Sequence, residues 1–304
     1  MFLKKGGAPD FVYVRFVPMD RRFLKFIWTI RLKYPNAKLL LEIATYPYTA
    51  ELLRNVTMLP FYFKDKVYQR KLKDIVDRVV TYSHDDNIFK IPTIKTRNGL
   101  IVAEQSMIQG HGDDGVIRLL AVAILQKAHG YERCIEGLAE YYRREPDRIV
   151  EIHIVGDGKE LNYYQWLVSY YHLEKYVVFH GRKFDKELDE IYNMADLALG
   201  IFGLYKNKTD TISSLKSVEY LAKGLPVISG CVEDVMKCKG GESFFQIFPN
   251  DTSVIDINQV VDFYDRSYNG GIDRSNIHQK IRDFAGKTVD MAVVMQPIMR
   301  YIDE

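Results

Sequence analysis

The sequence has few cysteines and no long apolar run. Its three cysteines, Cys134, Cys231 and Cys238, are widely spaced. That pattern fits neither a disulfide framework nor a zinc site, and it favours a reducing compartment such as the cytoplasm. Apolar runs such as 119–125 are far shorter than the roughly 18 residues of a membrane span. With 47% hydrophobic and 27% charged residues, the composition is that of an ordinary globular protein.

The chain also has little net charge, but that charge is unevenly distributed. The total is +2 over 304 residues, a length that suggests two domains. Residues 1–110 hold 19 Lys and Arg against 10 Asp and Glu, whereas residues 111–304 hold 23 against 30. The basic half predicts either an anionic partner, such as a membrane surface or a phosphorylated substrate, or a plain solvated surface. Its basic residues follow no nucleic-acid-binding pattern, so we expect no nucleic-acid partner.

The second half alternates short apolar runs with helical patterns. The runs predict strands over 116–123, 149–155, 176–179, 197–200 and 226–229. Apolar positions at helical spacing predict helices over 131–142, 161–172, 186–194 and 215–223. Near-continuous apolar strands that alternate with helices indicate a parallel sheet covered on both faces. We therefore expect a doubly wound α/β domain over 112–272.

The first half is also predicted to be α/β, and it is shorter. Strands are expected over 11–16, 38–43, 78–82 and 93–95, and helices over 21–32 and 61–76. The segment 109–115 holds three glycines and is predicted to be a linker. A long helical pattern runs from 276 to 302. The predicted organisation is thus a domain over 1–111, the domain over 112–272, and a terminal helical segment over 273–304 that crosses back to the first domain.

Two strand ends carry glycines at the edge where α/β proteins bind ligands. Gly156 follows the strand 149–155, and Gly181 follows His180 at the end of the next strand. Glycine there lets the chain turn tightly or lets a ligand approach the backbone. A plain tight turn at Gly156, and a structural histidine at His180, are the alternatives.

The helix 215–223 offers the strongest candidate chemistry. Ser213 or Ser214 is a natural N-cap, and the N-terminus of a helix suits a diphosphate. Lys216 could neutralise a phosphate, and Glu219, one turn further, could accept hydrogen bonds from two ribose hydroxyls. An ordinary surface ion pair between these two residues is the alternative.

The order of four segments resembles the donor-binding domain of the group-1, family-4 type retaining glycosyltransferases. They are 154–160 (IVGDGKE), 178–181 (VFHG), 194–197 (MADL) and 215–228 (LKSVEYLAKGLPVI). The segment 129–133 (HGYER) resembles the place where such enzymes carry a basic residue followed by glycine. In the first half, 42–48 and 92–99 are similar to acceptor-side segments of capsule and exopolysaccharide members.

The resemblance implies two Rossmann-like domains that face each other across a cleft (the GT-B fold), with an incomplete N-terminal domain in this chain. It implies sugar transfer with retention of configuration and without a metal ion, and no Asp-x-Asp metal motif is present. The implied catalytic residues are Lys216 and Glu42, and the implied acceptor-side residues are Thr45 and Tyr46. The implied donor-binding residues are His129, Gly130, Arg133, Gly156, Gly181, Arg182, Lys183, Ser213, Ser214, Leu215 and Glu219.

The resemblance also implies the partners. The donor would be a nucleotide-diphosphate sugar, with UDP the commoner base, and no separate cofactor is expected. The acceptor would be a saccharide or a polyprenyl-diphosphate-linked saccharide in surface polysaccharide biosynthesis. Aromatic and basic residues of the first half suggest peripheral contact with an anionic membrane at its inner face.

Two departures from the family pattern favour other interpretations. Thr211 stands where the family often carries a glutamate, and the first domain is shorter than the resemblance implies. A catalytically weak or inactive nucleotide-sugar-binding or partner subunit is therefore an alternative. A different enzyme on the same two-domain plan, such as a nucleotide-sugar epimerase, is a third interpretation, and the segment 215–228 speaks against it.

Overall fold

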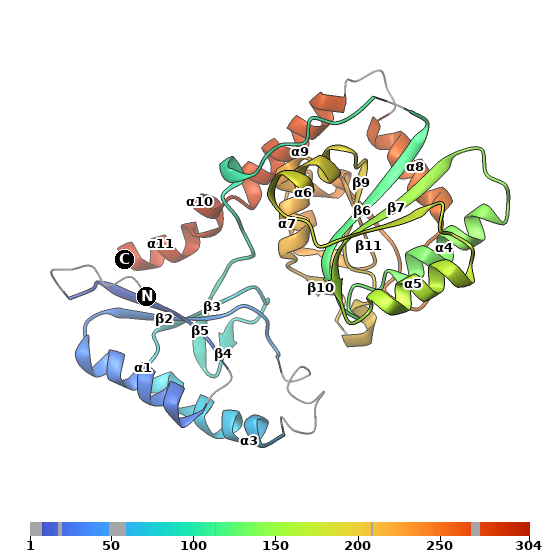
Figure 1. The fold of residues 1–304 in the computed structure, drawn as a ribbon. Coiled ribbons are helices and arrows are strands. Elements are labelled where there is room, and N and C mark those ends of the chain that lie inside the picture. The colour runs from blue at the N-terminus through green and yellow to red at the C-terminus, as the bar shows by residue number, and fades with distance from the viewer. Residues whose placement is uncertain (1–7, 18–19, 49–58, 113, 208, 269–273) are drawn as a thin grey trace. The chain divides into compact units, whose positions relative to one another are not determined.

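The computed structural model describes residues 8–17, 20–48, 59–112, 114–207, 209–268 and 274–304. The chain forms two compact units (Figure 1). The smaller, N-terminal unit comprises Met1–Arg97 and Val294–Glu304, and the larger unit comprises Asn98–Val293. In the described part of the chain, no helix is both long and apolar enough to cross a membrane.

The N-terminal unit contains a five-stranded sheet. Its strands lie in the order β1-β2-β3-β5-β4, and all are parallel except β4, which pairs antiparallel with β5. Their bounds are β1 Phe11–Arg15, β2 Lys38–Ile43, β3 Arg78–Thr81, β4 Asn87–Ile88 and β5 Ile91–Lys95. The helices are α1 Arg21–Lys33 and α3 Leu59–Tyr68, which continues as a 3₁₀ helix over Gln69–Asp74, and the C-terminal α11 Gln296–Asp303.

Alternation along the strands places apolar side chains on both faces of this sheet. Leu39 and Leu41 of β2 pack with Ile27 of α1 in one buried cluster. Leu40, between them, points to the other face and packs with Ile298 of α11. Since successive strand residues point to opposite faces, α1 and α11 cover opposite faces of the sheet.

The larger unit contains a six-stranded parallel sheet in the order β13-β11-β9-β6-β7-β8. Its strands are β6 Val116–Leu125, β7 Ile149–Gly158, β8 Val177–Gly181, β9 Leu197–Leu199, β11 Val227–Ser229 and β13 Phe245–Ile247. A separate two-stranded parallel pair joins β10 Thr211–Ile212 to β12 Val232–Glu233. The helices are α4 Glu132–Tyr142, α5 Leu161–Tyr170, α6 Asp185–Asn193, α7 Leu215–Lys223, α8 Ile257–Tyr268, α9 Arg274–Thr288 and α10 Met291–Val294.

Helices cover both faces of the larger sheet, as the apolar strands predicted (Figure 1). Leu119 of β6 lies in a buried cluster with residues of α4, α5 and α8. Leu120, the next residue, lies in a second cluster with residues of α6, α7 and α9. The predicted α/β class with parallel sheets is therefore confirmed.

The structure divides the chain differently from the expected domain limits. Val102 and Ile108, expected in the first domain, are buried in the cluster that α7 and α9 share. The first unit accordingly ends at Arg97 instead of residue 111, and α9 belongs to the larger unit. The helical pattern predicted over 276–302 is three helices, because Asp290 bridges to Leu100 and caps the backbone N–H of Ala292.

Candidate functional site

The candidate site lies at the carboxyl edge of the larger sheet, where the strand ends approach one another closely. Gly156 has φ +126°, and a Cβ there would lie 1.9 Å from the carbonyl oxygen of Ala123. Gly130 has φ +66°, and a Cβ there would lie 2.4 Å from the backbone nitrogen of Gly203. Both positions require glycine for backbone packing. Gly156 lies within β7 and pairs with Ala123 of β6, so close packing of the two strands, and not a tight turn, requires glycine there.

Helix α7 begins at this edge with a side-chain cap. The Ser214 hydroxyl accepts a hydrogen bond from the backbone N–H of Ser217 at 3.4 Å, and Ser214 is buried. The preceding Ser213 is held by Asn98, whose backbone N–H donates to Ser213 Oγ at 2.9 Å and whose amide donates to its carbonyl at 2.7 Å. Leu215, the first helical residue, is exposed. Hydrogen bonds of Ser213 and Ser214 thus fix the start of α7.

Lys216 points its ammonium group at the phenol of Tyr131. Its Nζ donates to the Tyr131 hydroxyl at 2.6 Å and lies 5.1 Å from the centre of that ring. Burial lowers the pKa of Lys216 to about 7, although the carboxylates of Glu233 and Glu219 partly oppose the shift. A lysine with this pKa is half protonated near neutral pH. Lys216 is therefore not simply one partner of a surface ion pair. A bound anion would favour its protonated form.

His129 lies next to this lysine. Its ring stacks on Tyr131 with centroids 5.6 Å apart, and its Nδ1 accepts the backbone N–H of Gln126 at 3.0 Å. Burial, together with Lys216, lowers the pKa of His129 to about 3. The ring is therefore neutral at physiological pH, with its proton on Nε2. It can donate one hydrogen bond to an anion without adding charge.

A buried carboxylate lies behind the first turn of α7. The Glu233 side chain is fully buried, and its Oε1 accepts a hydrogen bond from Ser217 Oγ at 2.9 Å. Its Oε2 is buried and has no hydrogen-bond partner among the residues that the structure describes. Burial raises the pKa of Glu233 to about 8. This residue is a further titratable group near Lys216, and the sequence alone did not reveal it.

Glu219 is oriented by a tyrosine from α6. The Tyr192 hydroxyl donates to Glu219 Oε1 at 2.9 Å, and the ring of Tyr192 is buried. Lys223, one turn beyond Glu219, bonds to Asp189 at 2.7 Å and lies over the Tyr192 ring. The carboxylate of Glu219 is thus fixed on the helix, with its other oxygen left to accept further hydrogen bonds.

Arg133 has a different role from the one expected. Only 1% of the residue is exposed, and its guanidinium donates to the carbonyls of Phe202, Pro249 and Ser253 at 2.6–2.8 Å. All three of its guanidinium nitrogens donate to backbone carbonyls. The expectation that Arg133 contacts the donor conflicts with this burial, and the side chain instead joins the loop after β9 to the loop between β13 and α8.

The expected base-binding segment lies at the end of β8. Gly181 has φ +66°, and a Cβ added there would meet no other atom within 4 Å. Arg182 donates to Asp157 at 3.1 Å, and Lys183 pairs with Glu187 at 3.2 Å. The segment is exposed, so its backbone is accessible to a ligand.

The residues expected from the first half lie in the N-terminal unit. Glu42 is near the end of β2 and accepts a hydrogen bond from the Tyr82 hydroxyl at 3.4 Å. Burial, and to a smaller extent the charge of Glu42, raise the pKa of Tyr13 and of Tyr82. Thr45 is exposed just beyond the strand, and Tyr46 is partly buried. These residues share one strand end within their own unit.

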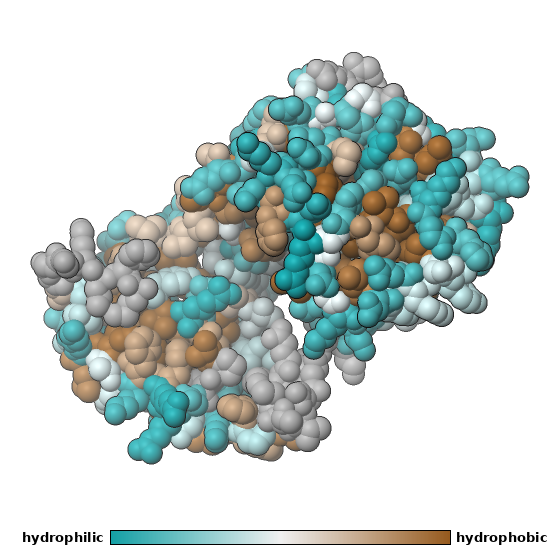
Figure 2. All heavy atoms as spheres, in the orientation of Figure 1, coloured by the Kyte–Doolittle hydropathy of each residue, from teal (hydrophilic) through white to brown (hydrophobic). Residues whose placement is uncertain are grey.

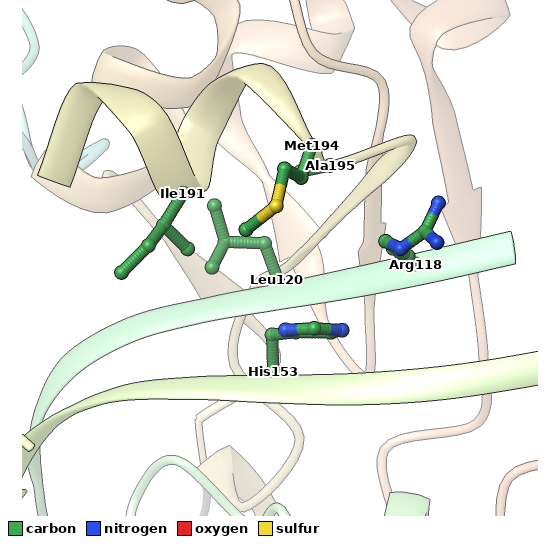
Figure 3. Close-up of a pocket in the computed structure, with 6 residues that line it drawn as sticks. All are labelled: Arg118, Leu120, His153, Ile191, Met194 and Ala195. Carbon is green, nitrogen blue, oxygen red and sulfur yellow. The ribbon is translucent and has the colours of Figure 1, made fainter. Parts of the chain in front are cut away.

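The pocket in Figure 3 is not a ligand site. Arg118, His153 and Met194 line it together with Leu120 of β6, Ile191 of α6 and Ala195 just beyond α6 (Figure 3). It encloses no space large enough for a water molecule. His153 Nδ1 lies 2.9 Å from His180 Nε2, and its Nε2 lies 3.1 Å from Glu151 Oε2. His180 therefore has a side-chain partner, His153, on the neighbouring strand, as its structural interpretation predicts.

Comparison with known proteins supports the resemblance seen in the motifs. Residues 117–255 match the family described as glycosyl transferases group 1. No curated protein matches the chain. Among solved structures, a glycosyltransferase from Rickettsia africae is 14% identical, with a TM-score of 0.64 over 97% of this chain and 76% of that chain.

Two further structures show the same similarity. HepE from Anabaena in complex with UDP is 14% identical, with a TM-score of 0.66 over 93% of this chain and 77% of that chain. A sucrose-phosphate synthase from Thermosynechococcus elongatus is 14% identical, with a TM-score of 0.64 over 97% and 73%. At this identity the similarity establishes the fold. The chain has the α/β fold of these enzymes, and less than half of it, 117–255, matches the group 1 glycosyltransferase family.

Proposed function

We propose that this protein is a glycosyltransferase that uses a nucleotide-diphosphate sugar and transfers the sugar with retention of configuration. The observation that supports this most directly is the first turn of α7. There, an N-terminal helix end, a lysine with a pKa of about 7 and a fixed carboxylate come from one helix of nine residues. The group 1 family match over the same segment points to the same chemistry.

The diphosphate would bind at the N-terminus of α7. Backbone N–H groups and the helix dipole favour an anion there. Lys216 would become fully protonated against the phosphates, and the Nε2–H of His129 would donate a further hydrogen bond. These groups would stabilise the charge that develops on the leaving diphosphate, so we propose transfer that needs no metal ion.

The ribose would bind at Glu219. The hydrogen bond from Tyr192 fixes one carboxylate oxygen. The remaining acceptor capacity suits two neighbouring hydroxyl groups. The exposed backbone of 181–183 would contact the base, for which we propose uracil. On the other unit, we propose Glu42 as a catalytic residue and Thr45 and Tyr46 as contacts of a saccharide or lipid-linked acceptor.

Calorimetry with UDP, GDP and ADP tests donor binding. Replacement of Glu219 by Ala should weaken nucleotide binding by about 1.5–3 kcal/mol, the usual loss for a hydrogen bond to a charged group. Glu190→Ala, an exposed glutamate of the adjacent helix α6, is the matched control and should bind as the wild type does. Equal affinity in the Glu219 variant would reject the ribose role.

Turnover distinguishes the enzyme from an inactive binding subunit. Wild-type protein should release nucleotide from a UDP-sugar, and NMR of the product should show the anomeric configuration of the donor. Nucleotide binding without any transfer or hydrolysis across a panel of UDP-sugars would favour the binding subunit. An inverted product would contradict retention.

We also propose that the N-terminal unit contacts an anionic membrane, as expected for an enzyme of surface polysaccharide synthesis at the inner face. Exposed apolar side chains of α1 and α3 lie among exposed basic ones, and Figure 2 shows hydrophobic and hydrophilic residues together on this surface. The apolar set is Phe26, Trp28, Leu32, Phe61, Phe63 and Val67. Such a surface suits anionic lipid headgroups. Vesicles with anionic lipid should co-sediment the protein and neutral vesicles should not; equal binding would contradict this.

A further inference from the structure

Helix α5 presents three near-parallel aromatic rings to solvent. Tyr163, Trp166 and Tyr170 are 42%, 56% and 62% exposed. The ring centroids of Tyr163 and Trp166 are 6.1 Å apart at an interplanar angle of 13°. Those of Trp166 and Tyr170 are 5.2 Å apart at 22°. The three rings form a continuous aromatic ladder along one helix face.

The ladder is not needed to hold α5 in place. Tyr164, Leu167 and Val168 bury the opposite face of the helix against the sheet and α4. Single exposed apolar side chains are normal on a protein surface, but three in contact with one another are not, and contiguous patches mark binding sites.

The polar residues of this face are uncharged. Asn162, Gln165 and Ser169 are exposed on the same helix, and α5 contains no acidic or basic residue. Amides and hydroxyls can both donate and accept hydrogen bonds, as sugar hydroxyls require. The negative face of an aromatic ring also attracts the weakly positive C–H groups of a sugar ring.

Carboxylates of α4 act on the ladder. Burial, then the carboxylates of Glu136 and Glu132, raise the pKa of Tyr163, and Lys206, which pairs with Glu132, opposes that rise. Burial, and to a smaller extent the carboxylates of Glu132 and Glu140, raise the pKa of Glu136. The carboxylates of Glu132, Glu136 and Glu140 therefore outnumber Lys206 and disfavour an anionic membrane, a nucleic acid or an acidic polysaccharide.

The area is small for a protein partner. Three half-exposed aromatic side chains offer roughly 300 Å², since each can bury about 150–250 Å². A stable protein interface takes about 800 Å² from each partner. We propose that the ladder Tyr163–Trp166–Tyr170 is a secondary binding site for a neutral saccharide chain. The site is independent of the nucleotide site on α7.

The sequence provides its own reporter for the test. It contains two tryptophans. In the Trp28→Phe protein, Trp166 is therefore the only tryptophan, and excitation on the long-wavelength side of tyrosine absorption selects its emission over that of the tyrosines. Maltoheptaose or cellohexaose should shift its fluorescence in a saturable manner, and native electrophoresis through dextran or hydroxyethyl cellulose should retard the wild-type protein. The double variant Trp166→Ala/Tyr170→Ala should bind at least about tenfold more weakly.

Two controls make the result specific. Phe63→Ala removes an equally exposed aromatic residue of α3 and should be retarded as the wild type is. The double variant should keep its thermal midpoint and its affinity for UDP, which separates this site from the donor site. The proposal is overturned if no neutral glycan shifts the fluorescence of Trp166, or if only the anionic dextran sulfate shifts it. It is also overturned if sedimentation shows self-association that the double variant abolishes.

Discussion

The affinity for a nucleoside diphosphate should fall steeply as the pH rises above 7. In the free protein, burial beside Tyr131 lowers the pKa of Lys216 to about 7. A bound diphosphate favours the charged lysine, so binding must be accompanied by proton uptake wherever the free lysine is neutral. The terminal phosphate of UDP loses its last proton near pH 6, so its own titration ends below this window.

The size of the pH effect on nucleotide affinity follows from the lowered pKa of Lys216. At pH 9 only about 1% of a group with a pKa of 7 is protonated, which costs about 2.7 kcal/mol, or roughly a hundredfold in affinity. At pH 8 Lys216 alone should take up about 0.9 proton for each nucleotide bound. Calorimetry in buffers of different ionisation enthalpy measures that number directly. His129, with its pKa lowered to about 3, does not titrate in this range.

Variants identify the titrating group. Lys216→Met should bind weakly and show no pH dependence between 7 and 8, whereas Lys280→Met, an exposed lysine of α9, should keep the wild-type slope. Burial raises the pKa of Glu233 to about 8, so its ionisation would add to the loss of affinity above that value. Glu233→Gln removes this contribution and should leave the slope between pH 7 and 8. A flat wild-type profile, or a slope that survives in Lys216→Met, would refute the reasoning.

Three further predictions concern residues that position the site. Tyr192→Phe removes the hydrogen bond to Glu219 and should weaken UDP binding by about 0.5–1.5 kcal/mol in calorimetry; unchanged affinity would count against an oriented carboxylate. Arg133→Met leaves three loop carbonyls unpaired and should lower the free energy of unfolding by about 3 kcal/mol or more in urea titration; a loss below 1 kcal/mol would contradict its structural role. Gly156→Ala, with its Cβ 1.9 Å from a carbonyl oxygen, should markedly lower the thermal midpoint, and an unchanged midpoint would be the contrary result.

The fold of the larger unit was predictable because its strands are buried on both faces. Such strands have continuous apolar sequences, and the runs at 149–155 and 197–200 correspond to β7 and β9. The short strands β10 and β12 were not predicted, since two-residue strands carry no periodic pattern. The break between α9 and α11 was also missed, because it depends on the pairing of Asp290 with Leu100, which is distant in sequence.

The candidate site was predictable on its own helix and less so beyond it. The N-cap, Lys216 and Glu219 follow from the local sequence of α7. The contacts that tune them come from Tyr131 and Tyr192, on segments that the topology brings to α7. Arg133 was misassigned for the same reason: a basic residue after Gly130 suits a phosphate, and only the fold shows that distant loop carbonyls use it.

A crystal structure of the protein with UDP is the most direct test of the account. We expect the diphosphate at the first turn of α7, with a phosphate oxygen within hydrogen-bond distance of Lys216 Nζ, and the ribose hydroxyls on Glu219. A diphosphate bound elsewhere, with Lys216 still on Tyr131 and no ligand at Glu219, would contradict the proposed donor site.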